Sequence, residues 1–90
     1  MKDKLLKIIN HYGIDKQLKY IHSEYYELDE ATLKSFDTMY DFEIDHIAEE
    51  IADIMVMLKQ FQYYYGIEDK QIEEVMNYKI DRQLERIDNE

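Results

Sequence analysis

HIAEEIADIMVMLKQFQYYYG, residues 46–66, contains no proline and no glycine before its last position. Its length corresponds to more than about five helical turns. From Ile51 to Leu58 apolar side chains cover most of the circumference of such a helix, a pattern typical of a helix buried on several sides. The stretch therefore predicts a long central helix near residues 43–65, covered by other helices of the protein.

The rest of the chain predicts helices on both sides of this one. Proline is absent and glycine occurs only twice, so the chain lacks the turn-forming residues typical of a β-rich protein. Apolar residues recur at helical spacing and predict helices near 2–11, 15–36 and 68–87. Gly13 and Gly66 are expected to end the helices before them in the left-handed conformation. We predict one all-α domain over residues 1–90, a four-helix bundle-like subunit completed by homo-oligomerisation.

Composition excludes several classes of protein. The net charge of −10 opposes binding to nucleic acid, and the absence of cysteine excludes disulfides and thiolate sites. No apolar run approaches the ~18 residues of a membrane span, and the N-terminus has no signal-peptide pattern. We therefore expect a soluble, cytoplasmic protein with neither a nucleic acid nor a membrane as partner.

Two pairs of carboxylates lie beside the predicted core. Asp53 interrupts the apolar run, and Glu50 stands one turn before it on the same side of the helix. Glu24 and Glu27 repeat this spacing on the preceding helix. If these two helices pack antiparallel, the four acids converge into one cluster of oxygen ligands. Buried carboxylates that repel one another need a compensating cation.

Oxygen ligands favour hard divalent ions, so Mg²⁺ is the expected cofactor and Mn²⁺ an acceptable substitute. The competing interpretation is that these glutamates are solvated surface acids. A di-iron site is a weaker candidate, because Glu43-x-x-His46 has its spacing but such a site needs two of these motifs.

The acids belong to a longer pattern that covers residues from about 13 to 86. It consists of Gln17, Glu24-x-x-Glu27, a spacer of 22 residues, Glu50-x-x-Asp53, and Asn77-x-Lys79-x-x-Arg82. This pattern resembles the MazG family of all-α nucleoside triphosphate pyrophosphohydrolases. The chain lacks the Cys-Pro-Trp element of the longer members and is more similar to the short forms, which leaves the preferred base open.

The resemblance implies an enzyme that hydrolyses nucleoside triphosphates to the monophosphate and pyrophosphate. It implies that the four acids bind magnesium and that the protein assembles as a homodimer or a tetramer. Glu24 or Glu27 is the expected general base. The expected substrate-binding residues are Gln17 for the base, and Asn77, Lys79 and Arg82, continued by Arg86, for the phosphates.

Other interpretations stay open at this point. Phosphoribosyl-ATP pyrophosphohydrolases are similar in size and pattern, and a non-enzymatic helical interaction module would need no metal. Gln17 is more simply interpreted as an exposed surface residue, and the basic residues of the last helix are equally compatible with ion pairs to neighbouring acids. Tyr63, Tyr64 and Tyr65 are consecutive, so at least one should face outward, in packing or a dimer interface.

Overall fold

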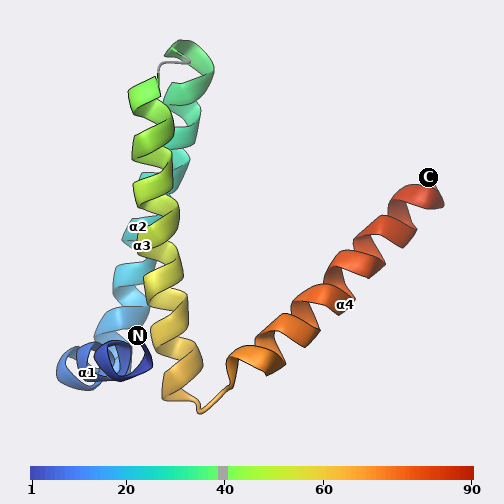
Figure 1. Ribbon diagram of the computed structural model, residues 1–90. Coiled ribbons are helices and arrows are strands. Elements are labelled where there is room, and N and C mark those ends of the chain that lie inside the picture. Colours follow the sequence, from blue (N-terminus) through green and yellow to red (C-terminus); the bar gives the residue numbers. More distant parts are fainter. Residues whose placement is uncertain (39–40) are drawn as a thin grey trace.

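The computed structural model describes residues 1–38 and 41–90, and the side chains of all of these except 36–38 and 41–43. It consists of four helices, α1 (Lys2–Tyr12), α2 (Ile14–Thr38), α3 (Asp41–Tyr64) and α4 (Asp69–Asp88) (Figure 1). The predicted all-α, four-helix subunit is confirmed, with helix bounds within two residues of the predicted ones. None of the helices in the described ranges is long and apolar enough to cross a membrane.

A small core joins the first three helices. α2 and α3 run antiparallel side by side, and α1 lies across one end of this pair and contacts both (Figure 1). Each helix contributes an apolar stripe, as the periodicity predicts. The buried apolar side chains are Leu5 and Ile9 from α1, Ile21 and Ala31 from α2, and Ile54, Met57 and Tyr63 from α3.

Both glycines end helices as predicted. Gly13 follows α1 with φ of 90°, and Gly66 follows α3 with φ of 71°. At Gly66 the Ile67 amide donates to the Gln62 carbonyl and the Gly66 amide donates to the Tyr63 carbonyl. This pair of bonds is a Schellman motif, which needs a left-handed residue at the position of Gly66. The chain therefore leaves α3 in a sharp, defined turn.

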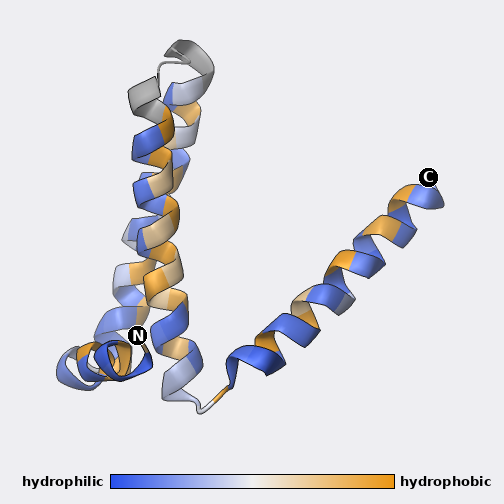
Figure 2. Ribbon diagram, in the orientation of Figure 1, coloured by the Kyte–Doolittle hydropathy of each residue, from blue (hydrophilic) through white to orange (hydrophobic). Residues whose placement is uncertain are grey.

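α4 projects away from the other three helices (Figure 1). It has no buried residue, although apolar residues run along its length in Figure 2. The expectation that α3 is buried on several sides is therefore wrong for the single chain, because α4 does not cover it. Ile51, Met55, Val56 and Leu58 are all more than two-fifths exposed.

Candidate metal centre

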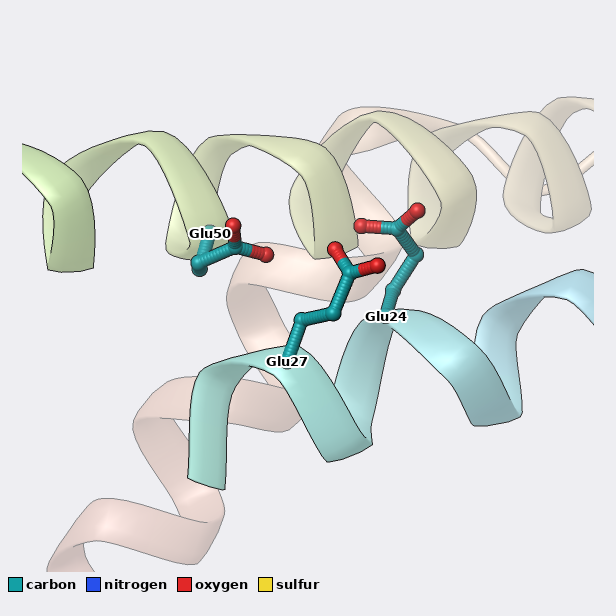
Figure 3. A group of neighbouring side chains, drawn as sticks. All are labelled: Glu24, Glu27 and Glu50. Carbon is teal, nitrogen blue, oxygen red and sulfur yellow. The ribbon is translucent and has the colours of Figure 1, made fainter. Parts of the chain in front are cut away.

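Three of the four predicted metal ligands converge between α2 and α3. Glu24 and Glu27 extend from α2 toward Glu50 on α3 (Figure 3). One carboxylate oxygen from each lies within 4.8 Å of the other two. The antiparallel packing of two helices that each carry acids three residues apart produces this arrangement. Three hard oxygen donors grouped in this way could hold a divalent cation.

Two of these carboxylates are buried, each with one oxygen left without a hydrogen-bond partner in the described part of the chain. Glu24 is 5% exposed and Glu50 is 7% exposed, and the Oε2 atom of each has no hydrogen-bond partner among the described residues. Burial raises the pKa of the Glu24 carboxyl, and the nearby Glu27 charge raises it further. Burial and then Glu27 likewise raise the pKa of Glu50. Because burial penalises a lone negative charge, a cation would relieve this site.

Asp53 lies next to the three glutamates, outside the group whose oxygens converge. It is exposed and lines an open cleft beside α2, which corrects the expectation of a buried charge. Asp53 and Glu24 both line a cleft of about 180 Å³ with Tyr20, Val56 and Met57. The cleft therefore continues from the acid group toward solvent, with an apolar wall.

Tyr20 belongs to this site, although the sequence analysis did not place it there. It stands one helical turn before Glu24, and hydrogen bonding to that carboxylate raises the pKa of its phenol. The same bond lowers the pKa of Glu24, against the effect of burial. The sequence signal for this contact was the spacing of four residues between Tyr20 and Glu24, which puts both on one face of a helix. Tyr20 thus supplies a hydroxyl donor to one candidate ligand.

Of the pair with di-iron spacing, Glu43 and His46, the structure describes the side chain of His46 alone. His46 is exposed, and its Nε2 atom lies 3.8 Å from Glu50 Oε1. The side chain of Glu43 lies outside the described residues. His46 therefore lies at the surface, beside a candidate ligand.

Gln17 does not occupy the exposed position that was considered for it. It is buried in the core, and its Nε2 atom donates to Gln60 Oε1 over 2.8 Å. Gln60 is fully enclosed and also approaches the Met57 sulfur at 3.8 Å. A buried amide must be hydrogen-bonded to avoid a large desolvation cost. The Gln17 amide thus finds its acceptor across the α2–α3 interface, next to the candidate site.

The predicted phosphate-binding residues all lie on α4. Lys79, Arg82 and Arg86, together with Gln83, line a shallow basic pocket of about 110 Å³. None of these cations forms an ion pair with a described residue, so the expected lattice with neighbouring acids is not formed; Arg82 instead lies over the Tyr78 ring at 5.8 Å. Since α4 stands away from α2 and α3, one chain does not bring this pocket to the acid group.

The raised pKa values predict how stability depends on pH. Glu24 and Glu50 bind protons more readily in the folded than in the unfolded chain, so stability rises as pH falls from the raised pKa toward the ordinary value of 4.5. Without divalent ions, we expect the melting temperature to rise as the pH is lowered toward that ordinary value. Saturating Mg²⁺ should abolish or reverse this rise, because bound metal requires ionised ligands.

Thermal unfolding followed by circular dichroism, with chelator and with Mg²⁺, measures this effect. Glu24→Gln should flatten the pH dependence in chelator, because it removes one of the two titrating groups. In chelator, a melting temperature that decreases as the pH is lowered, as expected for ordinary solvated acids, would contradict this prediction.

Comparisons with known proteins return no relative of this chain: no family profile, no curated protein and no solved structure matches it significantly.

Proposed function

We propose that this protein is a magnesium-dependent pyrophosphohydrolase that cleaves ribo- or deoxynucleoside triphosphates to the monophosphate and pyrophosphate. The observation that carries the proposal is the convergence of Glu24, Glu27 and Glu50, with two buried carboxylate oxygens left without partners. Isolated surface acids would not be buried in this way. The resemblance of the residue pattern to the MazG family supports the same chemistry.

In this proposal Glu24, Glu27 and Glu50 hold magnesium, and Asp53 completes the set from the mouth of the adjoining cleft. The metal would neutralise charge on the phosphoryl oxygens and lower the pKa of a bound water. Water attacks the α-phosphorus in line, the bond to the bridging oxygen breaks, and pyrophosphate leaves. Glu24 or Glu27 accepts the proton from the water; Glu27 is exposed and has direct access to solvent.

Substrate binding in this proposal needs more than one subunit. A triphosphate whose α-phosphorus lies at the acid group would meet the cations Lys79 and Arg82 only if an α4 helix lay against α2 and α3. The α4 helix of the same chain points away from them (Figure 1). We therefore propose that the active form is a homodimer or a tetramer, with the phosphate-binding residues of one subunit serving another.

The test is incubation of the protein with Mg²⁺ and a panel of ribo-, deoxy- and modified nucleoside triphosphates, with phosphoribosyl-ATP included. Pyrophosphate and orthophosphate are measured separately. We expect pyrophosphate and the nucleoside monophosphate in equal amounts, and no product in chelator. Orthophosphate with a nucleoside diphosphate would refute cleavage at the α-phosphorus, and turnover of phosphoribosyl-ATP alone would reassign the substrate.

The second candidate is a non-enzymatic helical interaction module. The exposed apolar faces of α3 and α4 favour it, since large apolar patches mark interaction surfaces. It predicts no product from any nucleotide and no effect of Mg²⁺ on the melting temperature. The enzyme predicts that Mg²⁺ raises the melting temperature, because an ion that binds only the folded state stabilises it.

A further inference from the structure

The direction of α4 is set at the turn that joins it to α3. Within residues 1–38 and 41–90, the backbone of α4 runs alongside none of the other three helices, and α4 buries no side chain. Residues 65–68 connect it to α3, and the rest of α4 stands clear (Figure 1). The contacts that determine where α4 points must therefore lie in or beside this turn.

Asp69, the first residue of α4, makes the side-chain contacts across the turn. Its Oδ1 atom accepts from Lys59 Nζ at 2.7 Å and from Gln62 Nε2 at 2.8 Å. The Tyr63 hydroxyl donates to both oxygens of the carboxylate, at 2.8 and 3.0 Å. Gln62 also donates to the Ile67 carbonyl at 3.0 Å. The start of α4 is thus bound by three side chains from the last turns of α3.

Two of these donors belong to buried residues, whereas the third is open to water. Gln62 is 7% exposed and Tyr63 is 8% exposed, and the Lys2 ammonium of α1 lies 5.6 Å from the centre of the Tyr63 ring. In the Lys59–Asp69 ion pair, the Asp69 side chain is 64% exposed. An exposed ion pair contributes little to stability, but a buried hydroxyl that loses its acceptor is left unsatisfied. The bonds from Gln62 and Tyr63 are therefore expected to hold α4 in place.

A small rotation at this turn displaces the cations of α4 by a large distance. Arg82 lies thirteen residues after Asp69 along the helix. At the helical rise, this is about 20 Å from the turn, so a rotation of about 10° moves Arg82 by about 3 Å. Groups that position a substrate lose much of their effect when they are displaced by about 1 Å. Phosphate binding by α4 therefore needs a fixed turn.

We propose that Asp69 is a positioning residue: by binding Gln62 and Tyr63 it fixes the direction of α4 and, through it, the location of Lys79 and Arg82. The direction of α4 follows from the contacts at the turn alone. The consequence for substrate binding rests on the proposed function, in which these two cations bind the phosphates. Direction and substrate binding can be measured separately.

Pulsed electron–electron double resonance between two spin labels measures the direction of α4. The chain has no cysteine, so Ser23→Cys on α2 and Glu85→Cys on α4, both at exposed positions, provide two unique labelling sites. Dilution with a large excess of the unlabelled protein limits the signal to distances within one chain. The labelled protein is compared with the same protein carrying Asp69→Ala, Tyr63→Phe or Lys59→Met. Circular dichroism checks the helix content of each variant.

We expect one narrow distance distribution in the wild type. Asp69→Ala should broaden it by at least about 5 Å, the displacement that about 12° of rotation gives at Glu85. Tyr63→Phe, which removes only a hydroxyl, should broaden it more than Lys59→Met does. The matched control is Asp81→Ala, because Asp81 is an exposed acid of α4 far from the turn. This control should keep the narrow distribution.

A broad distribution in the wild type, or a narrow one in Asp69→Ala, would overturn the proposal. Asp69→Ala also removes an acid from the first turn of α4, whereas Tyr63→Phe leaves α4 unchanged. Broadening in Asp69→Ala without broadening in Tyr63→Phe would therefore mean that Asp69 acts only on the start of its own helix, and the proposal would fail.

Kinetics tests the consequence for substrate binding. In Asp69→Ala, KM for a nucleoside triphosphate should rise about tenfold while kcat stays within about twofold, because a loosely held α4 presents its cations correctly for only part of the time. A fall in kcat with unchanged KM would contradict a positioning role. A wild type that releases no pyrophosphate would refute the proposed function alone, since the distance measurement requires no activity.

Discussion

Glu24→Gln is expected to abolish pyrophosphate release and to make the metal-free protein more stable than the wild type. The amide keeps the shape of the buried side chain but removes a charge that burial and Glu27 disfavour, as the raised pKa of Glu24 indicates. It also removes an oxygen ligand of the proposed metal. We expect turnover to fall by at least about 100-fold, and Mg²⁺ to lose its effect on the melting temperature.

Stability and activity should thus change in opposite directions, which separates a functional acid from a structural one. Glu30→Gln is the matched control, because Glu30 is an exposed acid on the same helix and the substitution changes the net charge equally. It should leave both turnover and the Mg²⁺ effect unchanged. A Glu24→Gln variant that still releases pyrophosphate at the rate of the control would remove Glu24 from the site.

The helices could be predicted closely because their signals are local. Periodicity and the two glycines are enough to place all four elements, and the helix ends at Gly13 and Gly66, both with positive φ, follow from residue type; Gly13, with ψ of 149°, is not in the expected left-handed helical conformation. The convergence of Glu24, Glu27 and Glu50 was also predictable, because an antiparallel pair of helices with matched spacing has few alternative registers.

The arrangement of α4 could not be predicted in the same way. An apolar stripe reveals that a helix needs a partner, but not whether that partner belongs to the same chain. The burial expected of the Ile51 to Leu58 run assumed an intramolecular partner, and much of this run is exposed because α4 does not cover it. Gln17 was misplaced for a related reason: its burial depends on Gln60, which lies 43 residues away and offers no local signal.

Mixing two inactive variants tests whether the site is shared between subunits. Arg82→Ala is expected to be inactive because it removes a cation of the basic pocket, while Glu24→Gln is inactive because it removes a ligand. If α4 of one subunit serves the acid group of the other, a mixed dimer has one site with both changes and one with neither. Random exchange of subunits should then restore about a quarter of wild-type pyrophosphate release.

The same mixture gives no recovery if each chain builds its own site, because every site then carries one of the two changes. Glu24→Gln mixed with Glu50→Gln is the control, since the structure places both acids in one group within one chain. That mixture should stay inactive under either arrangement. Recovery with Arg82→Ala and none with Glu50→Gln would locate the acids and the cations of one working site on different subunits, whereas no recovery in either mixture would require α4 to close onto its own chain.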